Sequence, residues 1–170
     1  METKKKEFSG NTHRYDPKKS IQRAKGARRG APHWRIEVAG HDYRWANRMD
    51  RVNLIREGLP YETIEVIGKR ADLPAIQMLR LFGIPQTTYN KKKRDEDLLS
   101  GRDSEVVLIL TELLDFGVEV FNNETEKFQR WLKKPNISLG GMTPVSLFDS
   151  LTGIQEVRNS LNRLEYGNLA

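Results

Sequence analysis

Beyond Trp45, apolar residues recur at about every third or fourth position, the spacing of amphipathic helices, and glycine or proline interrupts this pattern at intervals. The pattern predicts four helices before Gly101, over about residues 45–57, 60–69, 72–82 and 86–94. The apolar positions that define the first three are Met49, Val52, Ile55, Ile64, Ile67, Ile76, Leu79 and Phe82. The fourth helix follows Pro85, and its exposed face is polar and basic.

A long apolar run extends from Glu105 to Phe121. Its β-branched residues are compatible with a strand. Its length, the polar interruption at Thr111–Glu112 and the pair Leu113–Leu114 favour a buried helix.

Helix start signals recur in the last third of the chain. They are Asn123 with Glu126, Thr143 followed by Pro144, and Thr152 with Gln155. These signals predict a helix that carries Phe128, Trp131 and Leu132, a short helix from Pro144, and an amphipathic helix on Ile154, Val157, Leu161 and Leu164. Gly140–Gly141 supplies a tight backbone reversal between the first two.

The N-terminal segment has a different character. Residues 1 to about 40 lack apolar periodicity and are interrupted by glycine and proline, so we expect them to be largely disordered. Trp34, Ile36 and Val38 alternate with polar residues, which is typical of a short strand or a docking segment. Residues 1–48 carry thirteen basic and five acidic side chains, a net charge of +8, against −2 for the rest. This basic arm suits phosphate contacts or an acidic partner, or else is a solvated tail.

The composition excludes several classes of protein. The chain has no cysteine, which removes disulfides, thiolate metal ligands and cysteine nucleophiles and fits a cytoplasmic location. It has no apolar run long enough to span a membrane and no secretory signal at Met1. His13, His33 and His41 lack ligand-like spacing, so no metal site is expected. No catalytic residue and no cofactor is expected either, because nothing pairs the carboxylates and no glycine loop suits a phosphate.

Residues from Leu73 to Arg94 have the spacing of a helix-turn-helix, with Gly83 at the turn and Ile84 after it. The second helix of this motif can enter the major groove of DNA. The residues expected to face DNA are Gln86, Thr87, Asn90, Lys91, Lys92, Lys93 and Arg94. Leu79 is larger than the residue usual at its position, and Lys92 stands where an apolar residue is usual. The alternative is an ordinary helical bundle with a solvated basic face.

The C-terminal third carries a longer pattern. It contains, in order, Glu119–Val120–Phe121, Phe128, Trp131–Leu132, Pro135–Asn136, Leu139–Gly140–Gly141, Thr143–Pro144, Leu147 and Glu165–Tyr166–Gly167. This order resembles the toxin-binding domain of Xre/ParS/MbcA-type antitoxins, the partners of RES-domain toxins in bacterial type II toxin–antitoxin operons. The resemblance covers roughly residues 48–170 and is strongest at the C-terminus.

The resemblance implies an antitoxin that occludes the active site of an NAD-degrading RES-domain toxin and regulates its own operon through operator DNA. Residues implied to contact the toxin are Trp131, Leu139, Gly140, Gly141, Tyr166, Gly167, Asn168, Leu169 and Ala170. The last five would form a plug at the mouth of the toxin's NAD-binding cleft. Phe128 is expected in the core.

The expected fold is therefore all-α. It comprises a disordered basic arm (1–44), a helix-turn-helix-like bundle (45–101) and a helical toxin-binding domain (102–170). We expect a homodimer that reaches two DNA half-sites, with the apolar helix 105–121 as a candidate interface. A stand-alone DNA-binding regulator and an RNA-associated basic protein are the alternatives.

Overall fold

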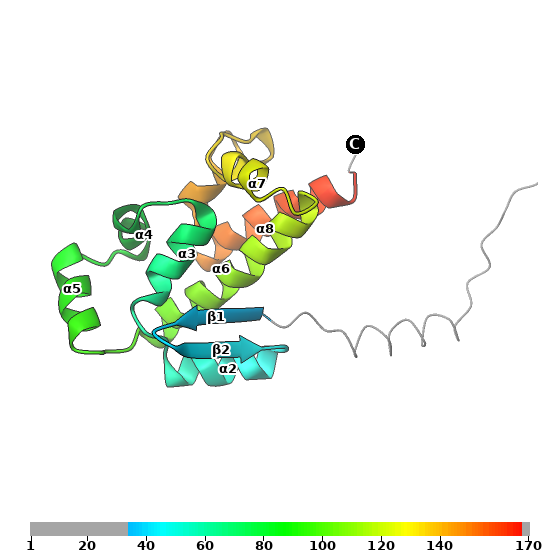
Figure 1. The fold of residues 1–170 in the computed structure, drawn as a ribbon. Coiled ribbons are helices and arrows are strands. Elements are labelled where there is room, and N and C mark those ends of the chain that lie inside the picture. Colours follow the sequence, from blue (N-terminus) through cyan, green and yellow to red (C-terminus); the bar gives the residue numbers. More distant parts are fainter. Residues whose placement is uncertain (1–33, 168–170) are drawn as a thin grey trace, which may run out of the picture. The chain divides into compact units, whose positions relative to one another are not determined.

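The computed structural model describes residues 34–167 (Figure 1). These residues are mostly helical, as expected, with one two-stranded sheet. The basic arm up to residue 33 lies outside the described residues, and so do Asn168, Leu169 and Ala170 of the expected plug. Within the described part of the chain, no helix is long and apolar enough to cross a membrane.

A β-hairpin precedes the helices. Strands β1 (Trp34–Val38) and β2 (His41–Trp45) pair antiparallel around Ala39 and Gly40, which both have positive φ, as a two-residue hairpin turn requires. The alternation at Trp34, Ile36 and Val38 thus marks a strand, and Ile36, Val38 and Trp45 are buried against α2, α3 and α6. The predicted disorder is therefore wrong for residues 34–44. The predicted start of a helix at Trp45 is also wrong, because Trp45 ends β2 and α2 begins at Arg48.

Four helices follow the hairpin, and their turns agree with the glycine and proline signals in the sequence. They are α2 (Arg48–Glu57), α3 (Thr63–Ala71), α4 (Ala75–Phe82) and α5 (Gln86–Arg94). Ile64, Ile67, Leu79 and Phe82 are buried as predicted. Met49 and Ile76 are exposed instead, and Met78 replaces Ile76 in the core.

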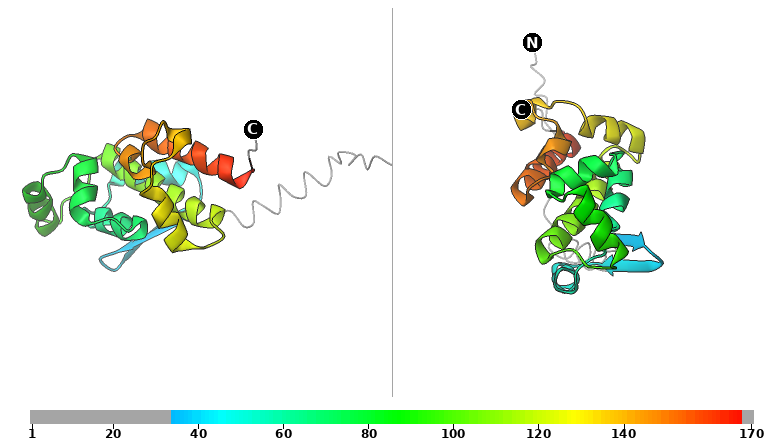
Figure 2. Two further views of the ribbon diagram at one scale, coloured as in Figure 1. Left: turned by 90° about the horizontal axis from the view of Figure 1, so that it is seen from above. Right: turned by 90° about the vertical axis from the view of Figure 1, so that its left-hand side faces the viewer.

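Helix α6 (Gly101–Val120) is the long predicted helix, and α2, α3 and α8 pack around it (Figures 1 and 2). Its apolar residues from Val106 to Leu114 are almost all buried within the protomer. The central position of α6 therefore explains the apolar run, and most of that surface is not available to a second copy.

The C-terminal part consists of α7 (Thr125–Leu132), the short 3₁₀ helices η1 (Ile137–Leu139) and η2 (Pro144–Leu147), and α8 (Leu151–Glu165). Helix α8 packs along α6, with Ile154, Val157 and Leu161 buried and Leu164 exposed.

The three predicted helix starts have different outcomes. Thr143 is the N-cap residue of η2 and Pro144 is its first residue, as predicted, but the predicted caps at Asn123 and Thr152 are wrong. Asn123 has φ 64°, which is incompatible with an N-cap, and Thr143 accepts no hydrogen bond through its side chain. The hydroxyl of Ser150, not Thr152, caps α8 by accepting a hydrogen bond from the Gly153 N–H at 3.1 Å.

Candidate functional site

The turn between α4 and α5 has helix-turn-helix geometry. Gly83 ends α4 with φ 66°, and the N–H of Ile84 donates to the Leu79 carbonyl at 2.9 Å. Pro85 is extended and leads directly into α5. Leu79 is buried here at 1% exposure, so the fold accommodates the larger residue beneath the turn.

The inner face of α5 is tied to α3 by a polar cluster. Tyr89 is buried, and its hydroxyl donates to Glu65 at 2.6 Å. The Lys93 ammonium donates to the same carboxylate oxygen at 2.8 Å and lies 5.7 Å from the centre of the Tyr89 ring. These two hydrogen bonds hold the pKa of Glu65 below its ordinary value, and the one from Lys93 has the larger effect. Lys93 therefore fixes α5 on α3.

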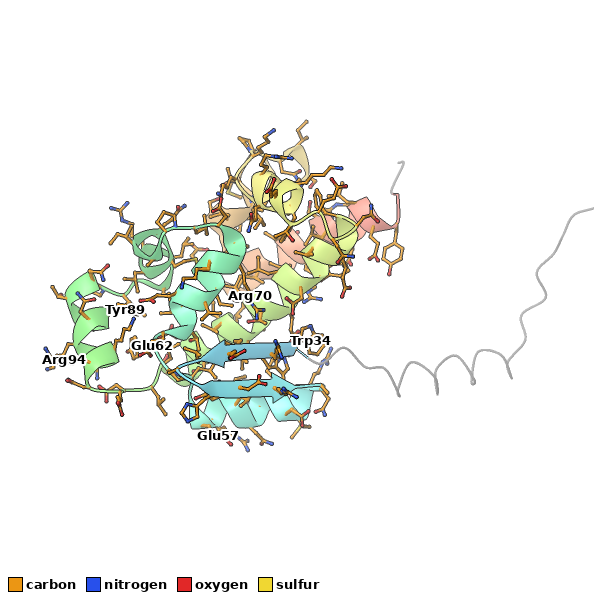
Figure 3. The ribbon with its side chains drawn as sticks, in the orientation of Figure 1. Trp34, Glu57, Glu62, Arg70, Tyr89 and Arg94 are labelled. Carbon is orange, nitrogen blue, oxygen red and sulfur yellow. The ribbon has the colours of Figure 1, made fainter. Side chains whose placement is uncertain are left out.

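The outer face of α5 carries five of the seven residues expected to meet DNA. They are Gln86, Thr87, Asn90, Lys91 and Arg94, and all are exposed. Figure 3 shows Arg94 on this helix, with Tyr89 also labelled.

Two pairs organise the cationic and amide groups of α5. The Gln86 side-chain amide donates to Asn90 Oδ1 at 3.0 Å, which orients both amides one turn apart. Lys92 is partly buried and donates to Asp97 at 2.8 Å, and this contact raises the pKa of Lys92. Lys92 and Lys93 are thus already paired with carboxylates.

An aromatic cluster joins α6 to α7. The rings of Phe121, Phe128 and Trp131 have centroids 5.6 to 6.1 Å apart. Phe128 is fully buried, in agreement with its expected core role, and packs over Gly117 of α6. Trp131 is only partly buried and forms the outer member of the cluster.

The loop that carries Gly140 and Gly141 is closed by Asn136. The Asn136 N–H donates to the Met142 carbonyl at 3.0 Å, and the Gly141 N–H donates to the Asn136 carbonyl at 2.9 Å. Both glycines have positive φ and are exposed. Leu139 is 5% exposed and anchors this loop in the core, so it supports the surface without forming it.

The same loop presents to solvent two apolar side chains that the sequence pattern does not predict to be exposed. Ile137 is 96% exposed and Met142 is 49% exposed. The Ser138 hydroxyl lies 2.8 Å from that of Ser160 on α8, and Leu164, 51% exposed, stands one helical turn beyond Ser160. No periodic pattern could have revealed Ile137, because it lies in a loop.

Tyr166 is 79% exposed at the end of α8, followed by exposed Gly167. We define the C-terminal apolar surface as Ile137, Met142, Leu164 and Tyr166. These four are half of the large apolar residues that are exposed in the described part of the chain. All four lie between residues 137 and 166, and exposed apolar side chains of this kind are available to a protein partner.

Metal-binding geometry is not found in residues 34–167, where no three histidine, aspartate or glutamate side chains gather. His41 lies in β2 and is exposed, and it bonds only the Ala39 carbonyl.

Comparison with known proteins relates both halves of the chain to antitoxins. Residues 50–108 match a family described as the antitoxin Xre-like helix-turn-helix domain. Residues 117–167 match a family described as the antitoxin Xre/MbcA/ParS C-terminal toxin-binding domain.

Three curated relatives agree with these matches. An Antitoxin Xre of Photorhabdus laumondii subsp. laumondii is 27% identical over 114 residues, 67% of this chain and 77% of the relative. An Antitoxin Xre of Yersinia enterocolitica is 28% identical over 68% of this chain and 78% of the relative. A Prs ADP-ribosylating antitoxin of a Sphingobium strain is 29% identical over 74% of this chain and 84% of the relative. These relatives are antitoxins and not enzymes. The chain therefore carries an Xre-like antitoxin helix-turn-helix domain followed by an Xre/MbcA/ParS C-terminal toxin-binding domain, the two domains of an antitoxin of a toxin–antitoxin system.

Proposed function

We propose that this antitoxin neutralises a RES-domain toxin that degrades NAD, by occluding the toxin's active site, and that it regulates its own operon through DNA. The observation that carries the first part is the C-terminal apolar surface on the toxin-binding domain. The proposed division assigns residues 45–101 to DNA binding and residues 102–170 to the toxin. The hairpin of residues 34–44 extends the first part, and residues 1–33 form the arm.

The proposed toxin chemistry is supported by the name of the Sphingobium relative, which refers to ADP-ribosylation of Prs. ADP-ribosyl transfer takes its ADP-ribose group from NAD. An NAD-consuming toxin is therefore consistent with this relative and with the C-terminal sequence pattern from Glu119 to Gly167.

Neutralisation needs tight binding. Nanomolar affinity corresponds to about −12 kcal/mol, which a few well-buried anchors must supply. Ile137, Leu164 and Tyr166 can act as such anchors because they are exposed in the free protein. Trp131 and the open backbone at Gly140–Gly141 complete the proposed contact surface, while Leu139 holds the loop from below. Gly167, Asn168, Leu169 and Ala170 would extend from Tyr166 into the NAD-binding cleft.

The outer face of α5 is proposed to contact operator DNA. Gln86 and Asn90 can hydrogen-bond adenine, while Lys91 and Arg94 can contact phosphates or guanine. Lys93 acts mainly by holding α5 on α3, whereas Lys92 ties α5 to Asp97 in the segment that follows it. A single recognition helix usually binds weakly, so we propose a homodimer that contacts two half-sites within the toxin–antitoxin assembly.

The test is co-expression with the product of the adjacent gene, followed by size-exclusion chromatography with light scattering and an NAD-consumption assay. We expect a stable complex in which NAD loss is suppressed. A complex that leaves NAD consumption unchanged would contradict active-site occlusion, and the absence of a complex would contradict the proposed partner.

The same assay tests the C-terminal apolar surface. Ile137→Ser removes the most exposed anchor without touching the core, so we expect weaker toxin binding at an unchanged Tm. Met49→Ser is the matched control, because Met49 is 65% exposed on α2 in the other domain. Equal toxin affinity of the two variants would remove Ile137 from the interface.

A further inference from the structure

A cavity of about 510 Å³ lies between the hairpin, α2, α6 and α8, apart from the C-terminal apolar surface and from the outer face of α5. Its wall includes Trp34 at the start of β1, Arg48 and Arg51 of α2, Glu112 of α6 and Arg158 of α8. Figure 3 labels Trp34 at the N-terminal end of β1. The volume is within the range of small-molecule sites.

The wall of this cavity has an excess of positive charge. Glu112 supplies its single carboxylate, and this side chain is only 11% exposed. One Glu112 oxygen accepts hydrogen bonds from the Trp45 indole at 2.9 Å and from Arg51 at 2.8 Å. With three arginines and one glutamate, the wall carries a net charge of +2. The nearby Asp50 is not part of the wall and accepts hydrogen bonds from Ala46 and Asn47.

Two of the three guanidinium groups keep their donors available. Arg158 forms an ion pair with Glu112 at 3.9 Å, which is too long for a hydrogen bond, and its guanidinium covers the Phe116 ring at 5.6 Å. Arg48 is exposed and has no ion pair or side-chain hydrogen bond within residues 34–167. Guanidinium groups in this situation bind phosphate or carboxylate oxygens, often through two parallel hydrogen bonds.

The cavity also has a flat aromatic wall. Trp34 stacks on Trp45 with ring centroids 6.2 Å apart and an interplanar angle of 28°. Trp34 is only partly buried, and it lines the cavity beside the arginines. An aromatic ring of a ligand can stack on such a surface.

We propose that this cavity binds a small phosphate monoester that carries an aromatic ring, the chemical class of mononucleotides. The phosphate would be held by Arg48 and Arg158, and the ring would lie against Trp34. A doubly charged phosphate matches the +2 charge of the wall better than a single carboxylate does. None of the wall residues belongs to the C-terminal apolar surface.

The experiment is isothermal titration calorimetry of the full chain with AMP, adenosine and inorganic phosphate. We expect saturable binding of AMP at one site per chain, and weaker binding of adenosine and of phosphate. No saturable heat with AMP at millimolar concentration would overturn the proposal. Adenosine binding as tightly as AMP would overturn the role of the arginines.

Three variants locate the site. Arg48→Gln should weaken AMP binding by about tenfold or more, because it removes a charged hydrogen-bond donor. Arg56→Gln is the control: it makes the same change on an exposed residue of α2 outside the cavity and should leave AMP affinity unchanged. Trp34→Leu should weaken AMP roughly fivefold or more while leaving phosphate binding unchanged. If the Arg48→Gln and Arg56→Gln proteins bind AMP equally well at unchanged Tm, the heat of AMP binding comes from non-specific attraction. That result would overturn the proposed site.

Discussion

At the scale of single residues, Gly117 controls how closely α7 approaches α6. A Cβ atom at this position would lie 2.2 Å from Phe128 Cζ, and Phe128 is fully buried. We predict that Gly117→Ala lowers the free energy of unfolding by about 1–3 kcal/mol, because overpacking outweighs the better helix propensity of alanine. Urea denaturation measures this change.

Gly101→Ala is the matched control on the same helix. A Cβ atom there would meet Ile55 at an ordinary 3.6 Å, so we expect little or no loss of stability. If both variants lose the same stability, the Phe128 contact is not the cause.

Glu65 makes the stability of the helix-turn-helix region depend on pH. Lys93 and the Tyr89 hydroxyl lower the pKa of Glu65 in the folded protein below its ordinary value of 4.5. A lowered carboxyl pKa stabilises the fold fully above the unfolded-state pKa, and this contribution is lost as pH falls through the folded-state pKa.

We therefore predict that the stability difference between wild type and Glu65→Gln is constant near neutral pH and shrinks below about pH 4.5. Chemical denaturation at a series of pH values measures it. Glu57→Gln, at an exposed position on α2, is the control for the loss of one charge. A difference that grows on acidification would contradict the assigned sign.

At the scale of elements, α5 has an exposed face, which we propose contacts DNA, and an inner face that supports the fold. Lys91 is exposed on the outer face, whereas Lys93 is paired with Glu65. We predict that Lys91→Gln weakens binding to the operon's own promoter DNA and reduces the salt slope by about one, at unchanged stability.

Lys93→Gln should instead lower the free energy of unfolding by up to about 1 kcal/mol, with a smaller effect on the salt slope. Fluorescence anisotropy at several salt concentrations, with thermal melting, distinguishes the two variants. If Lys93→Gln instead reduced the salt slope by about one at unchanged stability, Lys93 would contact the DNA and not α3.

Elements whose boundaries depend on glycine and proline were predicted well. Helix α5 begins after Pro85 and α4 ends at Gly83, since both residues constrain their own backbone. The predicted caps at Asn123 and Thr152 were wrong because capping depends on the backbone angle of the residue as well as on its type. Asn123 has a suitable side chain but a left-handed backbone, with φ 64°.

At the scale of the whole molecule, the C-terminal end is separable from the fold. The buried residues of α8 end at Leu161, and Leu164 to Gly167 are exposed. We predict that deleting Asn168, Leu169 and Ala170 leaves the Tm unchanged and weakens neutralisation of the toxin, because the plug would be lost without loss of core. Growth of cells that express the toxin measures protection, and full protection by the shortened chain would contradict the plug.

The candidate sites were predicted only where the signal is local. The exposed amides and charges of α5 follow from the sequence, because a helix after Pro85 must present most of a polar segment to solvent. The ion pair of Lys93 could not be predicted from the sequence, because its partner Glu65 lies 28 residues away along the chain. Ile137 was missed for a similar reason: the exposure of a loop residue depends on how the loop is closed and anchored.

By itself, the sequence determined the succession of helices, the helix-turn-helix spacing and the family pattern from Glu119 to Gly167, because turns and apolar periodicity act over a few residues. The tertiary structure decided which apolar residues are core and which are surface. It also decided that Glu112 meets Trp45, Arg51 and Arg158, which come from three different elements. The physical reason is that burial and charge pairing depend on neighbours in space, and packing around α6 brings together residues that are distant along the chain.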